Sequence, residues 1–371
     1  MSSEPSPLYI LYGVEISYFV GKVRAYMNYK RLNYTERAPT IFDFKRFGKK
    51  LHAGVIPVVQ LGNGDLIDDT SLIIESLEQI HPDRSIQPNT AIQTIAAMML
   101  EAWLDEVGHL IAIHTRWSHD ENYPLFRDTM GKSMFPWLPK FIRNKLVDRT
   151  AVSFMKMNKI RFGIVQEQIS LLDKWIDKIL NLLEQHFTHH EYLLGNRPSI
   201  ADYALIGACY GHLYTDPWPR RELIEPRQNL KRYIERVHSG TPATGDWLPD
   251  EALPETLQPI FQMLFDEFLP LVQTSVTATQ QYIEKKHKKQ GDIIARFPGK
   301  IKFPMLGKPY SKVAFSYTLW MLQRIQSECL KLDEQERIKV SSWMRIYSEI
   351  DFFNLDLGPK VERYGLQVRL R

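Results

Sequence analysis

The sequence is poor in cysteine: Cys209 and Cys329 are the only two thiols in 371 residues. Two cysteines provide neither a disulfide framework nor a ligand cluster for zinc. Both fall in apolar helical patterns, which predicts buried thiols that behave as small apolar side chains. We therefore expect no metal centre and no redox chemistry by the protein's own sulfur.

Long apolar runs are absent as well. No stretch of the sequence approaches the roughly 20 apolar residues that a membrane-spanning helix needs. The first seven residues are polar and proline-rich, without the basic start and apolar core of a secretory signal. We expect a soluble, cytoplasmic protein with no membrane span.

The sequence also lacks an excess of either charge. It has 47 basic and 43 acidic residues and a net charge of +4, which is too balanced to indicate a nucleic-acid partner. One dense basic run, Lys285 to Lys289, closes a long helical pattern. Cations are favoured at the negative end of a helix, so we interpret this run as a solvated helix end rather than as a surface for an anionic partner.

Short apolar strands alternate with helices in the first part of the chain. The pattern predicts strands over 8–12 and 34–38, helices over 19–31 and 42–50, a strand over 55–61, a strand over 66–68 and a helix from Asp69 to about residue 80. Asn63-Gly64 lies between the last two strands and is a strong hairpin signal. The predicted order is βαβαββα.

From about residue 90 the periodicity becomes helical. It predicts helices over 92–117, 152–187, 199–213 and 229–237, with a loop or broken helix over 120–140. After a Pro- and Gly-rich linker, further helices are expected over 254–286, 313–332 and 336–348, and residues 301–303 and 366–370 are expected to pair as a small β element. The division expected is 1–88, 89–245 and 246–371.

The turn between the first strand and the first helix carries a hydroxyl, Ser17. A helix N-terminus offers unpaired amide hydrogens and a partial positive charge, so a small side chain there can help to hold an anion such as a thiolate. Taken alone, Ser17 has a simpler interpretation as an ordinary helix cap.

Several motifs in the same order resemble the cytosolic glutathione transferases of the serine type. Ser17 stands seven residues before Arg24 in a Lys-Val-Arg ending, Pro57 matches the family's cis-proline, and Asp69-Thr70 matches its acid-hydroxyl pair. Residues 194–203 resemble the family's folding element, in which Ser199 and Asp202 form a capping box. The resemblance covers residues 8–240. It implies an α+β fold with a thioredoxin-like domain (1–88), an all-helical transferase domain (89–245) and a mostly helical extension (246–371).

The resemblance also implies roles for the matching residues, with glutathione as co-substrate. Ser17 would donate a hydrogen bond to the sulfur, and the backbone of Ile56, next to Pro57, would pair with the cysteinyl amide. Asp69 and Thr70 would receive the γ-glutamyl end, although without the resemblance both are plain capping residues. Three neighbouring residues depart from the pattern or oppose a thiolate: Tyr18, Val55 and the carboxylate of Glu15.

The magnitudes allow the role given to Ser17. A free thiol has a pKa of about 8.5, and lowering it by ~2 units requires a preference of ~2.7 kcal/mol for the thiolate. A hydroxyl hydrogen bond to a charged acceptor supplies about 1.5 to 3 kcal/mol, and a helix N-terminus adds about 0.3 to 1 kcal/mol.

Aromatic residues and histidine in the helical part are candidates for a second-substrate pocket: Trp103, His114, Trp117 and Tyr210, with Trp218 as a further candidate. Aromatics at helical spacing also pack in cores, so a packing role stays open for each. The histidine spacings do not indicate a metal site. The leading hypothesis is a detoxifying enzyme, commonly a homodimer in this family, that conjugates glutathione to a small hydrophobic electrophile. A binding or regulatory protein with the same fold, and a glutathione-dependent isomerase or dehalogenase, remain as alternatives.

Overall fold

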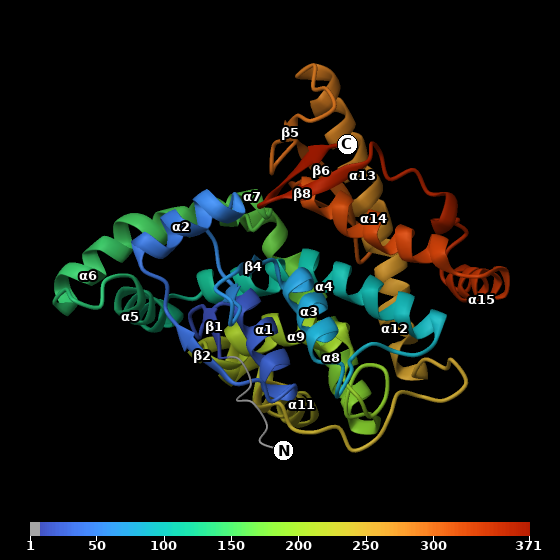
Figure 1. Cartoon of the computed structure of the whole chain (residues 1–371), viewed down its shortest axis with the longest axis horizontal. Coiled ribbons are helices and arrows are strands. Elements are labelled where there is room, and N and C mark those ends of the chain that lie inside the picture. Colours follow the sequence, from blue (N-terminus) through green and yellow to red (C-terminus); the bar gives the residue numbers. More distant parts are fainter. Residues whose placement is uncertain (1–7) are drawn as a thin grey trace. The chain divides into compact units, whose positions relative to one another are not determined.

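The computed structural model describes residues 8–371, apart from the side chains at positions 154 and 156. The chain forms two compact units from interleaved segments (Figure 1). The first unit takes residues up to 86, 111–157 and 202–244, and the second takes 87–110, 158–201 and 245–371. Three helices supply residues to both units: α4 (Ala91–Trp117), α7 (Ser153–Arg161) and α9 (Ile200–Ala208). The division by chain order into three domains stays a prediction.

The first unit contains a four-stranded sheet with the predicted βαβαββα order. Its strands are β1 (Tyr9–Tyr12), β2 (Tyr34–Arg37), β3 (Val58–Gln60) and β4 (Leu66–Asp68), in the spatial order β2-β1-β3-β4. The helices are α1 (Tyr18–Tyr29), α2 (Ile41–Leu51) and α3 (Thr70–Ile80). Parallel strands need a crossover, and α1 provides it between β1 and β2. The antiparallel pair β3 and β4 is joined by the predicted tight turn, where Gly64 has φ 87°.

Helices complete the first unit, and two of them, η1 (Asp120–Asn122) and α5 (Tyr123–Met134), lie in the segment expected as a loop or broken helix. The others are α6 (Lys140–Val147), η2 (Asp148–Val152), η3 (Cys209–Tyr214), α10 (Pro217–Pro219), η4 (Arg220–Ile224) and α11 (Gln228–Ser239). The stretch 120–140, expected as a loop or broken helix, is mostly α5. Its first proline, Pro124, occupies the start of that helix, where a missing N–H costs nothing, and the other two prolines follow its end.

The second unit is mainly helical and carries two small β elements. Its helices are α8 (Gln166–His189), η5 (Glu255–Leu257), α12 (Gln258–Met263), η6 (Leu264–Phe268), α13 (Leu269–Lys285), α14 (Ser316–Lys331), α15 (Glu334–Arg345) and η7 (Phe352–Asn354). Its strands are β5 (Ile293–Ile294), β6 (Lys300–Met305), β7 (Lys308–Val313), β8 (Val361–Tyr364) and β9 (Gln367–Leu370). Trp175 on α8 is fully buried, as are Phe261 and Phe268 of the C-terminal segment.

The predicted helix over 152–187 is two helices, α7 and α8, because a glycine interrupts it. Gly163 has φ 73°, in the left-handed region that favours glycine. A Cβ at this position would lie 2.0 Å from the carbonyl oxygen of Ser311, so the close approach of β7 also requires glycine. The apolar periodicity of the sequence continues across this break, so the pattern alone does not reveal that the helix is interrupted.

The predicted pairing of residues 301–303 with 366–370 is wrong. Both segments are strands, but β6 pairs with β7, and β9 pairs with β8 and β5. Leu306 and Gly307 have φ values of 48° and 71°, and Gly365 has φ 59°, so each strand turns back on its own neighbour in sequence. In residues 8–371, no helix is both long enough and apolar enough to cross a membrane.

Candidate functional site

Three segments singled out in the sequence leave the sheet at the same end. The ladder sets Tyr12 beside Val58 and Val58 beside Asp68. The chain continues from Tyr12 into the Ser17 turn, enters Val58 from Ile56-Pro57, and continues from Asp68 into Asp69-Thr70. Strand register therefore brings these three motifs together at one edge of the first unit. The peptide bond between Ile56 and Pro57 is cis, as the resemblance implies.

Ser17 is the N-cap residue of α1 and has an extended backbone, with φ −86° and ψ 132°. Among the described residues its side chain makes no capping hydrogen bond, and the residue is half-buried. The first turn of α1 contains no acidic residue, so no carboxylate of the helix competes for its free amides. This helix start is suited to an anion.

A buried arginine holds the Ser17 turn from behind. Arg116, at the end of α4, donates to the carbonyl oxygens of Ile16 at 3.0 Å and Gly211 at 2.5 Å, and to the carboxylate of Asp216 at 2.7 Å. Gly211 lies so close that a Cβ on it would be 3.1 Å from the carbonyl oxygen of Ser17. Sequence reasoning missed Arg116, because a cation at a helix C-terminus has an ordinary explanation.

Asp69 caps α3 in a left-handed conformation, with φ 75°. Its Oδ1 accepts hydrogen bonds from the amides of Ser71 at 3.1 Å and Leu72 at 3.2 Å, and Thr70 is buried. Asp69 therefore acts as an ordinary N-cap residue of α3. Roles for Asp69 and Thr70 in binding a ligand stay predictions.

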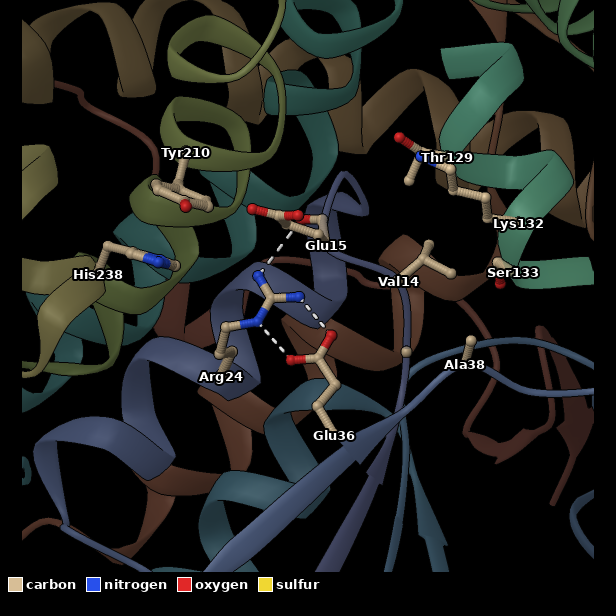
Figure 2. A pocket seen from close by; sticks show the side chains of 11 residues that line it. Val14, Glu15, Arg24, Glu36, Ala38, Thr129, Lys132, Ser133, Tyr210 and His238 are labelled. Carbon is tan, nitrogen blue, oxygen red and sulfur yellow. Dashed lines mark hydrogen bonds and ion pairs between the residues drawn. The ribbon is translucent and has the colours of Figure 1, made fainter. Parts of the chain in front are cut away.

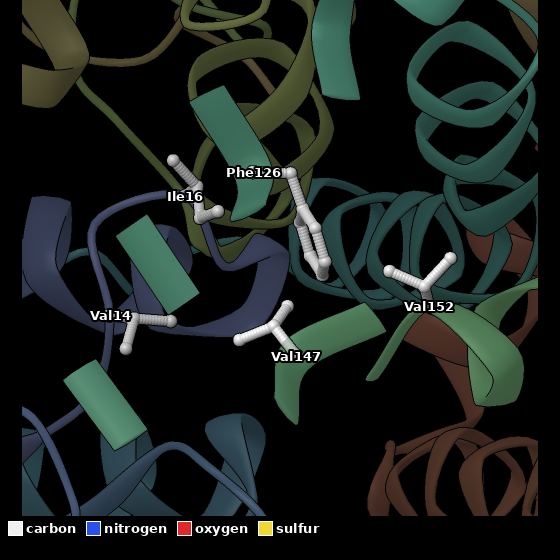
Figure 3. Close-up of a cluster of buried hydrophobic side chains, with 5 residues drawn as sticks. All are labelled: Val14, Ile16, Phe126, Val147 and Val152. Carbon is white, nitrogen blue, oxygen red and sulfur yellow. The ribbon is translucent and has the colours of Figure 1, made fainter. Parts of the chain in front are cut away.

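A cluster of apolar side chains packs against the same turn (Figure 3). It consists of Val14, Ile16, Phe126, Val147 and Val152, with Ile56 and Trp117 partly buried against it. The ring of Trp117 meets that of Phe126 edge-on at 4.6 Å between centroids. Through this cluster, the Ser17 turn and Ile56 pack against α5, α6 and η2.

A cavity of about 500 Å³ opens beside the turn (Figure 2). It is lined by Gly13, Val14, Glu15, Arg24, Glu36, Ala38, Thr129, Lys132, Ser133, Tyr210 and His238. The guanidinium of Arg24 lies between Glu36 and Glu15. Two of its nitrogens donate to the two oxygens of the Glu36 carboxylate, each at 2.6 Å. Its third nitrogen donates to the carbonyl oxygen of Glu15 at 3.3 Å. The exposed carboxylate of Glu15 forms no ion pair with any described residue. The lining therefore combines apolar surface with four charged side chains, those of Glu15, Arg24, Glu36 and Lys132.

Two rings form one wall of the cavity. Tyr210 and His238 stack with 3.3 Å between centroids and 6° between planes. Burial, aided by the nearby charge of Arg24, lowers the pKa of His238 to about 4. Burial raises the pKa of Tyr210, and the charge of Glu15 acts in the same direction. Both rings are therefore neutral near pH 7 and can offer hydrogen bonds and a flat apolar face.

Two family models match this chain: the glutathione S-transferase N-terminal domain over residues 11–85 and the glutathione S-transferase C-terminal domain over residues 166–236. The chain has the fold of the glutathione transferases. Residues 86–165 and 237–371 lie outside both matches, so neither model describes these parts of the chain. The comparison with curated proteins found no match.

Solved structures of glutathione transferases resemble the chain at low identity. One from Phanerochaete chrysosporium is 16% identical, with a TM-score of 0.46, over 64% of this chain and 98% of its own. One from Rhodospirillum rubrum F11 is 20% identical, with a TM-score of 0.39, over 67% and 96%. The beta-etherase LigF from a Sphingobium strain is 18% identical, with a TM-score of 0.42, over 62% and 95%.

The four predicted pocket residues have different surroundings. Tyr210 lines the cavity, and Trp117 packs in the apolar cluster. His114 is buried, with its Nδ1 3.0 Å from the hydroxyl oxygen of Ser118. Trp103 is 1% exposed and belongs to the second unit. Trp218 stacks on His119 at 3.3 Å between centroids.

The segment predicted as a capping box starts a buried helix. Ser199 directly precedes α9, Asp202 lies in its first turn, and both are fully buried. The hydroxyl of Tyr233 donates to the Asp202 carboxylate at 3.2 Å. The reciprocal bonds of the box stay a prediction. In the described part of the chain, no group of three or more His, Cys, Asp or Glu side chains is placed to hold a metal ion.

Proposed function

We propose that the protein is a glutathione-dependent transferase in which the Ser17 hydroxyl donates a hydrogen bond to the glutathione sulfur. The observation that carries this proposal is the state of Ser17: it sits at the N-terminus of α1, half-buried, with a hydroxyl that is not used to cap the helix. A thiolate at this position would meet both the hydroxyl and the positive end of the helix.

The proposed reaction is a substitution at carbon. The thiol proton leaves to solvent, the sulfur forms a bond to the electrophilic carbon, and the leaving group departs with its electron pair. A hydroxyl hydrogen bond and a helix terminus together supply about 2 to 4 kcal/mol, which is enough to lower the thiol pKa toward neutrality.

The tripeptide would extend from Ser17 along the shared sheet edge. The backbone of Ile56 would pair with the cysteinyl amide, and Asp69 would face the γ-glutamyl ammonium. Since Asp69 already takes the amides of Ser71 and Leu72, the γ-glutamyl carboxylate would rely on Thr70. Val55 offers no cation to the glycyl carboxylate.

The acceptor would occupy the cavity beside the turn. Its lining narrows the expected substrate class, because the charged side chains of Glu15, Arg24, Glu36 and Lys132 lie among apolar surface. We therefore propose an electrophile that carries a hydrogen-bonding or charged group next to a flat ring, which could stack on Tyr210. Detoxification, a cytoplasmic location and a homodimer remain proposals from the family.

One observation favours a second candidate, a binding protein that does not catalyse. Glu15 is an exposed carboxylate without an ion-pair partner in the described residues, two positions from Ser17. A negative charge there raises the pKa of a nearby thiol and opposes the thiolate.

The test combines binding with turnover. Glutathione at millimolar concentration should raise the thermal unfolding midpoint, because a ligand bound to the folded state stabilises it by mass action. Against a panel of polar aromatic electrophiles, Ser17→Ala should lose about 10- to 100-fold in kcat/KM, and Ser17→Thr should retain most of the activity. A midpoint shift without conjugation in the wild type would support a protein that binds glutathione without catalysis. No shift would contradict the transferase and leave only a binding protein that does not use glutathione.

A further inference from the structure

Large apolar side chains are exposed on two segments of the first unit. At the start of α2, Ile41 is 53% exposed and Phe42 is 73% exposed. In and before α6, Trp137 is 60%, Phe141 74% and Ile142 37% exposed. Exposed apolar side chains that occur singly need no explanation, but groups of them mark interaction surfaces.

Cations accompany both groups. Residues 41–51 contain four basic residues and one acidic residue, and residues 132–149 contain five basic residues and one acidic residue. The acidic residue of α2, Asp43, forms an ion pair with Arg37 at 2.8 Å. Besides Lys132, which pairs with Asp128 at 2.6 Å, five lysines of these segments are exposed to solvent: Lys45, Lys49, Lys50, Lys140 and Lys145. Each segment thus combines apolar side chains with a net positive charge.

Both segments adjoin the apolar cluster that packs against the Ser17 turn. Ala38, three positions before Ile41, packs against the apolar cluster that includes Val147, the last residue of α6. In α6 the inward side chain Val147 anchors the helix, while Phe141 and Ile142 at its other end are exposed. Residues 132–149 also lie outside both family-model matches, so the proposed glutathione chemistry does not account for them.

We propose that these residues form a docking surface for an anionic lipid bilayer. The cationic aromatic surface consists of Ile41, Phe42, Trp137, Phe141 and Ile142 with the five exposed lysines named above. The apolar side chains would enter the headgroup region, where a tryptophan ring is favoured, and the lysines would meet lipid phosphates. The protein would bind the surface of the bilayer without crossing it. This binding does not depend on the proposed transferase activity.

Charge and side-chain type favour a bilayer over other occupants. A two-fold contact between two copies would bring the same lysines face to face, which is repulsive. Nucleic acid attracts lysines and stacks on aromatic rings, but Ile41 and Ile142 gain nothing from it. An anionic bilayer satisfies the cations and the aliphatic side chains together.

Vesicle flotation with the full chain tests the proposal. The protein should float with vesicles of equal parts phosphatidylcholine and phosphatidylglycerol, and should stay behind with phosphatidylcholine alone. Trp137→Ser with Phe141→Ser, and separately Lys140→Glu with Lys145→Glu, should each weaken binding by about tenfold or more. The matched control is Ile338→Ser with Ile346→Ser, which removes two exposed isoleucines of the second unit, 60% and 69% exposed, and should bind as the wild type does.

Two further measurements keep the proposal falsifiable. The four substituted residues are exposed, so unchanged thermal unfolding midpoints should show that the variants are folded. Quenching by brominated lipid should be smaller in Trp137→Phe than in the wild type at equal binding. No flotation with anionic vesicles, equal loss in the control variant, a dimer that Trp137→Ser with Phe141→Ser dissociates, or binding of an oligonucleotide in place of vesicles would overturn the proposal.

Discussion

The turn that carries Ser17 depends on a guanidinium that never reaches the cavity. Arg116 connects the Ile16 carbonyl, the Gly211 carbonyl and the Asp216 carboxylate, and both members of its ion pair are almost fully buried. Removing one partner of a buried pair leaves an unpaired charge in a region of low dielectric. Arg116 is therefore a positioning residue for the turn.

Arg116→Met should lower the free energy of unfolding by about 3 to 5 kcal/mol near pH 8. Burial raises the pKa of Asp216, and Arg116 opposes that shift. Without Arg116 the pKa rises further, so the folded state holds a proton that the unfolded state has lost. Stability is then gained as the pH falls through the folded pKa, and the loss should be smaller at pH 5 than at pH 8.

Chemical denaturation at the two pH values measures this effect. The matched control is Arg127→Met, which breaks the half-exposed pair with Asp148 and should cost less than about 1 kcal/mol at both. A loss in Arg116→Met that is equal at both pH values would contradict the account of Asp216.

Glu15→Gln should increase conjugation below the thiol pKa. Removing a negative charge close to the sulfur favours the thiolate, so the pH profile of kcat/KM should move to lower pH, with an increase of about two- to fivefold at pH 6. Glu36→Gln is not a clean comparison, since that carboxylate is paired with Arg24. An exposed carboxylate elsewhere, Glu255→Gln, serves as the control. An unchanged profile would place Glu15 too far from the sulfur to matter.

Local patterns in the sequence were enough to predict most elements, whereas long-range contacts were not. The thioredoxin-like order follows from period-two and helical patterns with Asn63-Gly64 and Asp69 as turn and cap. The break at Gly163 depends on Ser311, far along the chain, and the strand pairings of β6 and β9 depend on turns that periodicity does not reveal. The same holds for the site: Ser17 and Asp69 belong to local motifs, but Arg116 and the Tyr210–His238 stack are assembled only by folding.

The β6–β7 hairpin is fastened to α4 by a buried network. Lys312 of β7 donates to one oxygen of Glu106, and the Thr318 hydroxyl of α14 donates to the other. Lys312 has a side chain that is 0% exposed. The pair therefore joins the C-terminal segment to α4 within the second unit.

Lys312→Met should reduce the free energy of unfolding by about 3 to 5 kcal/mol, because Glu106 is left buried without its cation. The combination Lys312→Met with Glu106→Leu should recover part of that loss, since it removes both charges. Equilibrium denaturation with a double-mutant cycle measures the coupling. The control, Lys339→Met, breaks the exposed pair with Glu251 and should cost less than about 1 kcal/mol. A double variant no more stable than the single one would contradict this explanation.

At the scale of the whole molecule, the C-terminal third is part of a shared core. Residues 245–371 form one compact unit with 87–110 and 158–201. Trp175 of α8 donates to Glu267 at 2.6 Å, and His186 lies 2.7 Å from the Thr256 hydroxyl oxygen. The sequence resemblance ends near residue 240, so sequence comparison gives no sign that the extension completes a core.

A chain that ends after Thr244 should therefore fail to fold. It would expose the apolar face of α8, including Leu172, Trp175 and Ile176, all of which are buried in the full chain. Soluble yield, near-ultraviolet circular dichroism and thermal unfolding would be compared with the full chain and with a control that lacks only Arg371, which is exposed. A cooperative, soluble product ending at Thr244 would contradict the shared core.

The most direct test of the central claim is a titration of bound glutathione, followed by the ultraviolet absorbance of its thiolate. In the wild type and in Ser17→Thr, the midpoint should lie about one to two pH units below that in Ser17→Ala, because the hydroxyl hydrogen bond is lost in the alanine variant. Within the described residues the Ser17 side chain makes no capping hydrogen bond, so the alanine variant should fold normally. Identical midpoints in all three proteins, or no binding of glutathione at millimolar concentration, would contradict the role of Ser17.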